Sequence, residues 1–274
     1  MREVLILAGR EIAEALRNRW FLAAALSLGG LAVALAFVGA TPGGETRTAA
    51  LAIAVANLSS LSVYLVPLLA LLLSFDGLVG EAERGTLNLL LTYPVSRWQV
   101  VIGKFVGYLV VLGLALALGY GGAGVLVGYR GGSAEGWQLY AAMTGASLAL
   151  GAAFLAVGCL VSALARERAT AIGICIAVWL GLVVLYDLAL LGLLVLDESH
   201  RIDQAMLGAA LVVNPTDAYR LLTLASVDAV AAVSGMTGLA AEAGLGRPLL
   251  VASIGCWILA PLGLAVALFH RREV

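Results

Sequence analysis

The sequence predicts an all-α membrane protein in which six transmembrane helices follow an amphipathic N-terminal helix and both termini are cytoplasmic. Apolar residues make up 62% of the chain and charged residues 12%, whereas soluble domains contain about 45–50% and about 25%. Because one helical crossing takes about 20 apolar residues, a chain of 274 residues has room for about six or seven crossings. The basic residues also fall mainly on one side of the expected crossings. Composition, length and charge placement thus predict the same fold class.

Residues 1–19 are predicted to form an amphipathic helix that lies in the membrane interface. Leu5, Ala8, Ile12 and Leu16 recur at helical spacing, and arginine and glutamate residues occupy the other face. The alternative is a cytosolic extension of the first crossing. The segment lacks the short basic start, apolar run and small-residue cleavage site of a signal peptide, so the first crossing is expected to target the chain to the membrane.

Residues 20–274 are predicted to form one domain that contains the six crossings. Each span is long enough to cross the hydrocarbon core and is bounded by charged residues, glycine or proline. The spans are expected at about 20–39, 51–75, 102–128, 139–162, 171–196 and 249–269. Two connections are longer than turns, namely an inner loop at 76–101 and an outer loop at 197–248. Two Gly-x-x-x-Gly pairs in the third span, Gly103 with Gly107 and Gly124 with Gly128, are expected to permit close packing of neighbouring helices.

The basic residues predict the orientation, because Lys and Arg are retained on the cytoplasmic side of a membrane protein. With the N-terminus inside, the eleven inner basic residues are Arg2, Arg10, Arg17, Arg19, Arg84, Arg97, Lys104, Arg166, Arg168, Arg271 and Arg272. The five outer ones are Arg47, Arg130, Arg201, Arg220 and Arg247. Three of these five belong to the long outer loop, where the rule is weak. Both termini are therefore expected in the cytoplasm.

The sequence lacks the motifs of an enzyme. Lys104 is the only lysine, and its neighbours lack the upstream glycine and the following Ser or Thr of a phosphate-binding loop. No HExxH or GxSxG motif occurs. His200 and His270 lie outside the expected spans, and the three cysteines are scattered through apolar runs. We expect no catalytic residue, metal ligand or cofactor in this chain, and the net charge of −1 predicts no surface for nucleic acid.

Asp187, which follows Tyr186, is the only acidic residue placed well inside an expected span. A carboxylate inside the hydrocarbon is costly, so such a residue is a functional candidate by default. Two interpretations are open. Asp187 and Tyr186 form an intramembrane polar site, or Asp187 is a hydrogen-bonded packing residue near the outer end of its helix.

The inner loop contains the most informative stretch of the chain. Thr86 is suited to N-cap a short helix, and Pro94 prevents its easy continuation. Acidic residues precede this helix, and an exposed ridge of leucines along it would need a partner groove. A plain interfacial re-entrant helix is the alternative. The candidate contact residues are Glu81, Glu83, Arg84, Gly85, Thr86, the ridge residues Leu87, Leu90 and Leu91, and Pro94.

This stretch resembles the type-2 ABC exporter permease family, whose membrane subunits carry a Glu-rich, Gly-Thr, leucine, Pro, Ser-Arg, Gly-Lys pattern between spans two and three. The matching residues are Glu81, Glu83, Gly85, Thr86, Pro94, Ser96, Arg97, Gly103 and Lys104. The resemblance implies a permease domain at 20–274 whose inner loop is a coupling helix that docks into a cytoplasmic ABC ATPase dimer. It also implies that residues 1–19 form an elbow helix and that the partner ATPase binds ATP and Mg. The chain is then a multi-pass protein of the inner (plasma) membrane, surrounded by membrane lipid.

More narrowly, residues 75–105 resemble the membrane subunit of the ABC transporter that helps to mature the copper centres of nitrous oxide reductase in denitrification. This resemblance implies a homodimer, formed with a second copy of the chain, and a periplasmic partner protein. No Met-rich or His-rich tract argues independently for copper. The alternative functions are a secondary carrier that uses Asp187, and a force-transmitting anchor for a periplasmic partner without substrate flux.

In the outer loop, the sequence Asn-Pro-Thr-Asp predicts the start of a helix. Asn214 is a good N-cap, Pro215 suits the first helical position, and Asp217 places an acid in the first turn. One interpretation of this helix is a docking surface for a periplasmic protein, and the other is a lid folded on the chain's own spans. The candidate docking residues are Asn214, Pro215, Asp217, Tyr219 and Arg220.

Overall fold

The computed structural model describes residues 2–38, 47–92, 95–128, 134–196, 203–224 and 246–271. These residues form helices joined by turns, and no strand occurs among them. In five stretches of the described residues the helix is long and apolar enough to cross a membrane. The prediction of an all-α membrane protein is therefore confirmed.

Helices occupy all six stretches in which a crossing is expected. They are α2 (Arg19–Val38), α3 (Arg47–Ser74), α6 (Arg97–Gly128), α7 (Ala134–Leu164), α14 (Arg247–Arg271) and the continuous run of α8 (Arg168–Trp179), η1 (Leu180–Leu185) and α9 (Tyr186–Leu196). In α2 the apolar stretch is shorter and covers Ala25–Leu35. The number of crossings and the cytoplasmic side of the termini stay predictions.

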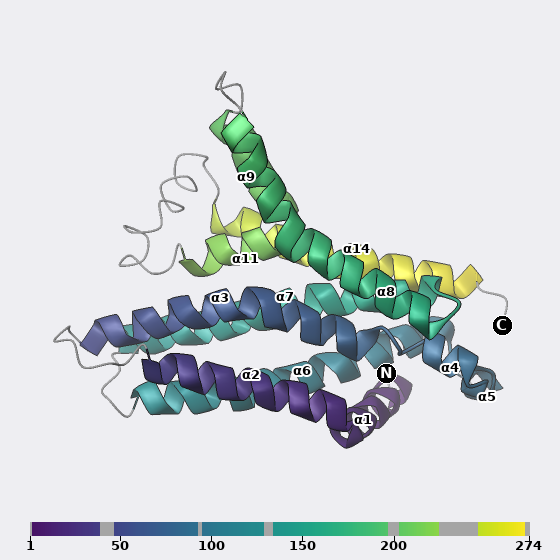
Figure 1. Ribbon diagram of the computed structural model, residues 1–274. Helices are drawn as coiled ribbons and strands as arrows, with labels where there is room; N and C mark the ends of the chain where they lie inside the picture. Colours follow the sequence, from purple (N-terminus) through teal and green to yellow (C-terminus); the bar gives the residue numbers. More distant parts are fainter. Residues whose placement is uncertain are drawn as a thin grey trace.

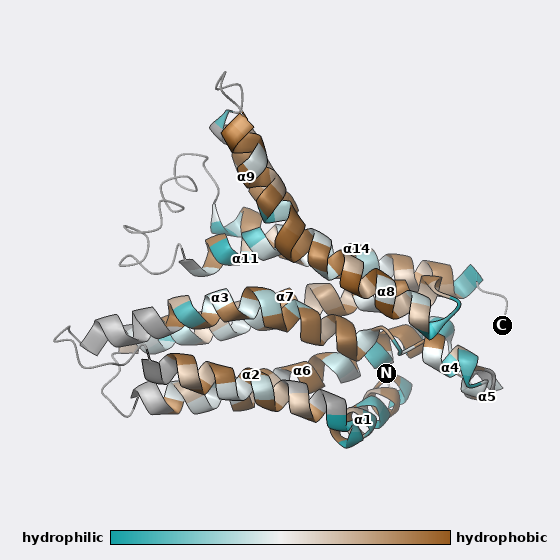
Figure 2. Cartoon of the chain, viewed as in Figure 1, coloured by the Kyte–Doolittle hydropathy of each residue, from teal (hydrophilic) through white to brown (hydrophobic). Residues whose placement is uncertain are grey.

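The core lies between α7 and the helices that contact it, α3, α6 and α14, while α2 packs on the outside of α6 (Figure 1). The side chains of Leu58, Leu112, Leu150 and Phe154 are fully buried in this core. Exposed side chains are also apolar along α9, for example Leu188 and Leu191, and the ribbons of α8 and α9 are largely brown in Figure 2. α9 contains no buried residue at all. Apolar outward faces suit helices that border lipid, which is itself as apolar as leucine.

The N-terminal helix α1 (Arg2–Arg17) is seated on two glycines of α6. A Cβ atom on Gly107 would lie 2.7 Å from Cβ of Glu11 and 3.0 Å from the carbonyl oxygen of Ala8. A Cβ atom on Gly103 would lie 2.8 Å from Cβ of Leu7. The Gly-x-x-x-Gly spacing therefore permits close contact between α6 and α1. The helix that packs on these glycines is thus the N-terminal helix and not another span.

The inner loop consists of two short helices, α4 (Val79–Glu83) and α5 (Thr86–Thr92). They project at the end of the molecule that also carries the start of α1 and the end of α14, which we call the inner end (Figure 1). Gly85 between them has a φ of +70°, which glycine adopts without steric cost. Thr86 is the first residue of α5, and its hydroxyl donates a hydrogen bond back to the carbonyl oxygen of Glu81 at 3.2 Å. Thr86 thus ties α5 to α4, whereas an N-cap was expected.

Two helices of the outer loop, α10 (Gln204–Val213) and α11 (Pro215–Leu224), fold back on the spans. α11 contacts α3, α7 and α14. Oδ1 of Asn214 accepts hydrogen bonds from the backbone N–H and the hydroxyl of Thr216, at 3.1 and 2.8 Å. The predicted helix start at Asn214 and Pro215 is therefore confirmed.

Candidate functional site

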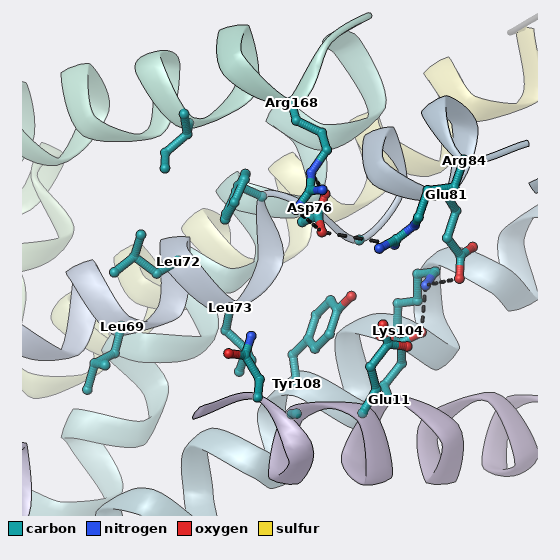
Figure 3. Close-up of a pocket in the computed structure, with 16 residues that line it drawn as sticks. Glu11, Leu69, Leu72, Leu73, Asp76, Glu81, Arg84, Lys104, Tyr108 and Arg168 are labelled. Atoms are coloured by element: carbon teal, nitrogen blue, oxygen red, sulfur yellow. Dashed lines mark hydrogen bonds and ion pairs between the residues drawn. The ribbon is translucent and has the colours of Figure 1, made fainter. Parts of the chain in front are cut away.

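A buried ammonium group joins three elements at the inner end of the bundle. Lys104 of α6 donates a hydrogen bond to Oε1 of Glu11 in α1 at 2.5 Å, and its Nζ lies 3.0 Å from Oε1 of Glu81 in α4 (Figure 3). All three residues are only 3–4% exposed. The N-terminal helix and the inner loop are thus both attached to α6 through one cation.

A fourth residue balances the charge of this contact. Two carboxylates and one ammonium leave a net negative charge, and Nη2 of the half-exposed Arg10 lies 3.1 Å from Oε1 of Glu81. Loss of one member of a buried ion pair typically costs about 3–5 kcal/mol, because the remaining charge is left buried without compensation. The cluster is therefore stable only while Lys104 and the two glutamates are all present.

A second set of contacts attaches the inner loop to α8 and α7. Nε of Arg168 lies 2.6 Å from Oδ1 of Asp76, and its Nη2 donates to Oδ2 of the same carboxylate at 2.8 Å. Glu83 accepts the backbone N–H of Arg168 at 2.7 Å, where the helix dipole favours a negative charge. Oγ of Ser162 in α7 accepts two backbone N–H groups at the start of α4, at 2.9 and 3.1 Å. The inner loop is therefore attached to α1, α6, α7 and α8.

The candidate contact residues of the inner loop differ in exposure, and Thr86 is partly buried. Glu81 and Leu87 are buried, so in this conformation they attach the loop from within and do not face a partner. Leu89, which is not part of the predicted ridge, is 66% exposed and is the apolar side chain that α5 presents outward. The exposed candidates are Glu83, Arg84 and Gly85. The side chains of Leu90 and Leu91, and the whole of Pro94, lie outside what the structure describes.

The predicted polar site at Asp187 is an ion-pair contact between α9 and the outer loop. Arg220 of α11 pairs with Asp187, and its Nη1 also lies 3.1 Å from Oδ1 of Asp217. Tyr186 donates its hydroxyl to the carbonyl oxygen of Ala210 in α10 at 2.7 Å. Burial, with the nearby negative charge of Asp187, raises the pKa of Asp217 to about 7. The cluster therefore fastens α10 and α11 to the start of α9.

Most of the candidate docking residues of the outer loop point into the protein. The buried ones are Asn214, Pro215, Asp217 and Tyr219. Nδ2 of Asn214 donates to the carbonyl oxygen of Leu182 in η1 at 2.8 Å. Arg220 is partly exposed. The described part of the loop is thus arranged as a lid on its own spans, while residues 225–245 lie outside the description.

A chain of buried hydroxyl groups, which no sequence motif indicates, links α11 to three spans. The hydroxyl oxygens of Tyr219 and Ser147 lie 2.8 Å apart. Ser147 donates to Oγ of Ser62 at 3.3 Å, and Oγ of Ser62 lies 2.5 Å from the hydroxyl oxygen of Tyr120. All four residues are buried. The four residues belong to four different helices, α11, α7, α3 and α6, so only the folded structure brings them together.

No metal centre is evident in the part of the chain that the structure describes. Cys159 and Cys175 are buried, whereas Cys256 is exposed. Within those ranges, no three His, Cys, Asp or Glu side chains converge as metal ligands would.

Comparison with known proteins identifies the family of this chain. The sequence family described as ABC-2 family transporter protein matches residues 5–274. The chain is 40% identical to the probable ABC transporter permease protein NosY of Pseudomonas aeruginosa, with both chains covered completely. It is 38% identical to the probable ABC transporter permease protein NosY of Stutzerimonas stutzeri, with 99% of each chain covered. These matches and the apolar helices show that the chain is a multi-pass inner-membrane permease of an ABC transporter and belongs to the ABC-2 family.

Proposed function

We propose that this permease acts as a homodimer that couples a separate cytoplasmic ATPase dimer to movement of its spans. The observation that supports this proposal is the attachment of the inner loop. The segment α4–α5 projects from the inner end, and buried ion pairs of Lys104 tie it to α1 and α6. Because paired and closely packed elements move together, a displacement imposed on α5 by a partner would reach the spans.

Several features favour an ATP-driven permease over a secondary carrier. The family consists of transporter proteins of the ABC-2 type, and the chain has no phosphate-binding loop of its own, so ATP and Mg are assigned to the partner subunit. Asp187, the residue on which a carrier would depend, is paired with Arg220. That pairing supports a structural role for Asp187.

We assign the transporter to copper-site assembly of nitrous oxide reductase. The support is the full-length identity of 40% and 38% to two NosY permeases, together with the resemblance of residues 75–105 noted above. A periplasmic partner protein belongs to the same assignment. A force-transmitting anchor without substrate flux is the second candidate, because the described part of the outer loop is fastened to the spans by Asp187, Arg220 and the hydroxyl chain.

The coupling proposal is tested by Leu89→Asp, which places a charge on the exposed face of α5 without touching the ion pairs. The variant is expected to insert in the membrane normally but to lose co-purification of the ATPase and permease-dependent ATP hydrolysis. Leu196→Asp is the matched control, since Leu196 is an exposed leucine at the end of α9, which points away from α5 (Figure 1). Wild-type ATPase binding and activity in Leu89→Asp would contradict the proposal.

The assignment to nitrous oxide reductase has a separate test in cells that lack the endogenous permease. Copper content and activity of the reductase are measured after complementation with the wild type or with Leu89→Asp, at equal permease abundance. We expect both to fall with the variant. Flux of copper or of a sulphur species into proteoliposomes containing permease and ATPase then separates a transporter from an anchor.

A further inference from the structure

A cavity of about 510 Å³ lies beside the buried ion pairs at the inner end of the bundle (Figure 3). Residues of α1, α3, α4, α6 and α8 line it, so it includes the N-terminal helix and the start of the fifth expected span. Its volume falls within the range of about 300–1,000 Å³ that is usual for small-molecule sites. Since ion pairs connect the surrounding elements, the cavity is a built feature of the fold and not a gap between loose helices.

The lining of the cavity is divided between an apolar and a charged part. The apolar part consists of Leu69, Leu72, Leu73, Phe75 and Ile172. In Figure 3, the labelled leucines lie on one side of Tyr108, whereas Lys104 and Glu81 lie on the other. A ligand that fits this division has an apolar portion joined to a charged portion.

Both signs of charge are available to such a ligand. The carboxylate of Glu14 lines the cavity and has no hydrogen bond or ion pair within the described ranges. Oε2 of Glu81, in the wall of the cavity, has no hydrogen-bond partner among the described residues, and because it is buried a ligand would reach it only after a shift of this side chain. Arg84 comes only within 4.0 Å of Asp76, and its side chain is about half exposed. Carboxylates with unused acceptor capacity thus share one space with a guanidinium that has unused donors.

The position of the cavity favours a lipid. It lies where the apolar stretch of α3 ends and the charged residues of the inner loop begin. This is the level at which headgroups of the adjoining leaflet are expected, next to an amphipathic helix of the interface. A polar metabolite could bind the charged residues, but it would leave the apolar wall of the cavity without a contact.

We propose that this cavity binds a zwitterionic aminophospholipid of the inner leaflet, with a phosphoethanolamine headgroup. The ammonium lies against the carboxylates of Glu14 and Glu81, the phosphate lies at Arg84, and the start of an acyl chain runs along Leu72 and Leu73. A primary ammonium has three N–H donors for carboxylates, and guanidinium matches phosphate geometry. A choline headgroup has no N–H to donate, and a phosphatidylglycerol headgroup has no ammonium group to pair with Glu14. Binding does not require the ATPase, so it is independent of the coupling proposal.

The test uses the full-length permease purified without its ATPase. The protein is placed in nanodiscs that contain equal amounts of phosphatidylethanolamine, phosphatidylcholine and phosphatidylglycerol, and native mass spectrometry counts the lipids retained on release. We expect phosphatidylethanolamine to be retained over each of the others by at least about tenfold, which corresponds to about 1.4 kcal/mol. The double variant Glu14→Gln with Arg84→Gln should abolish this preference. Leu72→Trp, which fills the apolar wall and leaves the charges intact, should lower retention of all three lipids at the site.

Arg166→Gln is the matched control, because Arg166 is an exposed arginine in the turn before α8 that does not line the cavity. It should retain phosphatidylethanolamine as the wild type does. Equal retention of the three lipids by the wild type, or a preference for phosphatidylglycerol, would overturn the proposal. A preference for phosphatidylethanolamine that persists in both cavity variants would also overturn the proposal. If those variants change the oligomeric state and not lipid retention, a second copy of the chain occupies the cavity and the proposal is wrong.

Discussion

Replacement of Lys104 by methionine tests the central contact of the inner end. Methionine preserves the length and much of the volume of the side chain but removes the ammonium between Glu11 and Glu81. Both carboxylates are buried, so they would be left close together without the cation that lies within 2.5 and 3.0 Å of them. The cost expected for removing one member of such a buried cluster is about 3–5 kcal/mol.

The effect can be measured by thermal unfolding of the purified permease. For a chain of about this length, 1 kcal/mol shifts Tm by about 2–4 °C, so Lys104→Met should lower Tm by roughly 6–20 °C. Because α1 contains exposed arginines that α6 would no longer secure, limited trypsin digestion should also cleave α1 faster. Addition of Glu11→Gln and Glu81→Gln to Lys104→Met should recover most of the loss, since neutral amides leave no uncompensated charge.

Two results would refute this reasoning. The first is a Tm for Lys104→Met within about 2 °C of the wild type, less than the shift expected for 1 kcal/mol. The second is a triple variant as unstable as the single one, which would show that packing and not charge determines the cost. Either result would also weaken the inference that one cation transmits movement from the inner loop to α1 and α6.

Three further predictions concern other parts of the molecule. Gly107→Ala should lower the free energy of unfolding by about 1–3 kcal/mol and expose α1 to trypsin, because the added methyl group meets the backbone of α1. Gly113→Ala is the control, since the nearest neighbour of a Cβ atom there is a side-chain atom at 3.7 Å. Equal effects of the two substitutions would contradict the contact between α1 and Gly107. Asp217 has a pKa of about 7 in the folded protein and an ordinary value of 3.8, so its contribution to stability should fall as pH rises from about 4 to 7. The Tm of the wild type should therefore decrease over this pH range, and Asp217→Asn should remove that decrease. If the decrease is unchanged in Asp217→Asn, another group causes it. A reporter after Val274 should give a cytoplasmic signal and one within residues 225–240 a periplasmic signal, and two signals on the same side would refute the expected topology.

The positions of the helices could be predicted from the sequence because long apolar runs have few ways to satisfy their backbone in a membrane. Their ends were less predictable. The third span was expected from about residue 102, whereas α6 begins at Arg97. The additional turn begins with the polar Arg97, whose Nη1 donates to the carbonyl oxygens of Phe269 and His270 at the end of α14. Such a contact depends on a partner far along the chain, which hydropathy does not reveal.

The inner site could be predicted as a segment but not as a set of contacts. The resemblance indicated the right loop, and Glu81 and Lys104 both belong to its pattern. The burial of Glu11 could not be predicted from the sequence, because a glutamate in an amphipathic helix is expected on the solvent-facing side. Leu87 was expected to be exposed for a similar reason, because in a helix as short as α5 periodicity alone does not show which side turns inward.

The π-helical segment η1 sets the direction in which α9 presents Asp187 to Arg220. At its end, the N–H of Tyr186 bonds to the carbonyl oxygen of Gly181, a π-type and not an α-type spacing. An α-helix advances by about 100° per residue, so deletion of one residue here would turn the whole of α9 about its axis. Asp187 would rotate away from its arginine although every side chain of the cluster remained. Among relatives of this permease, the length of this segment should therefore vary less than its residues, and an alignment that opens a gap within it would be suspect.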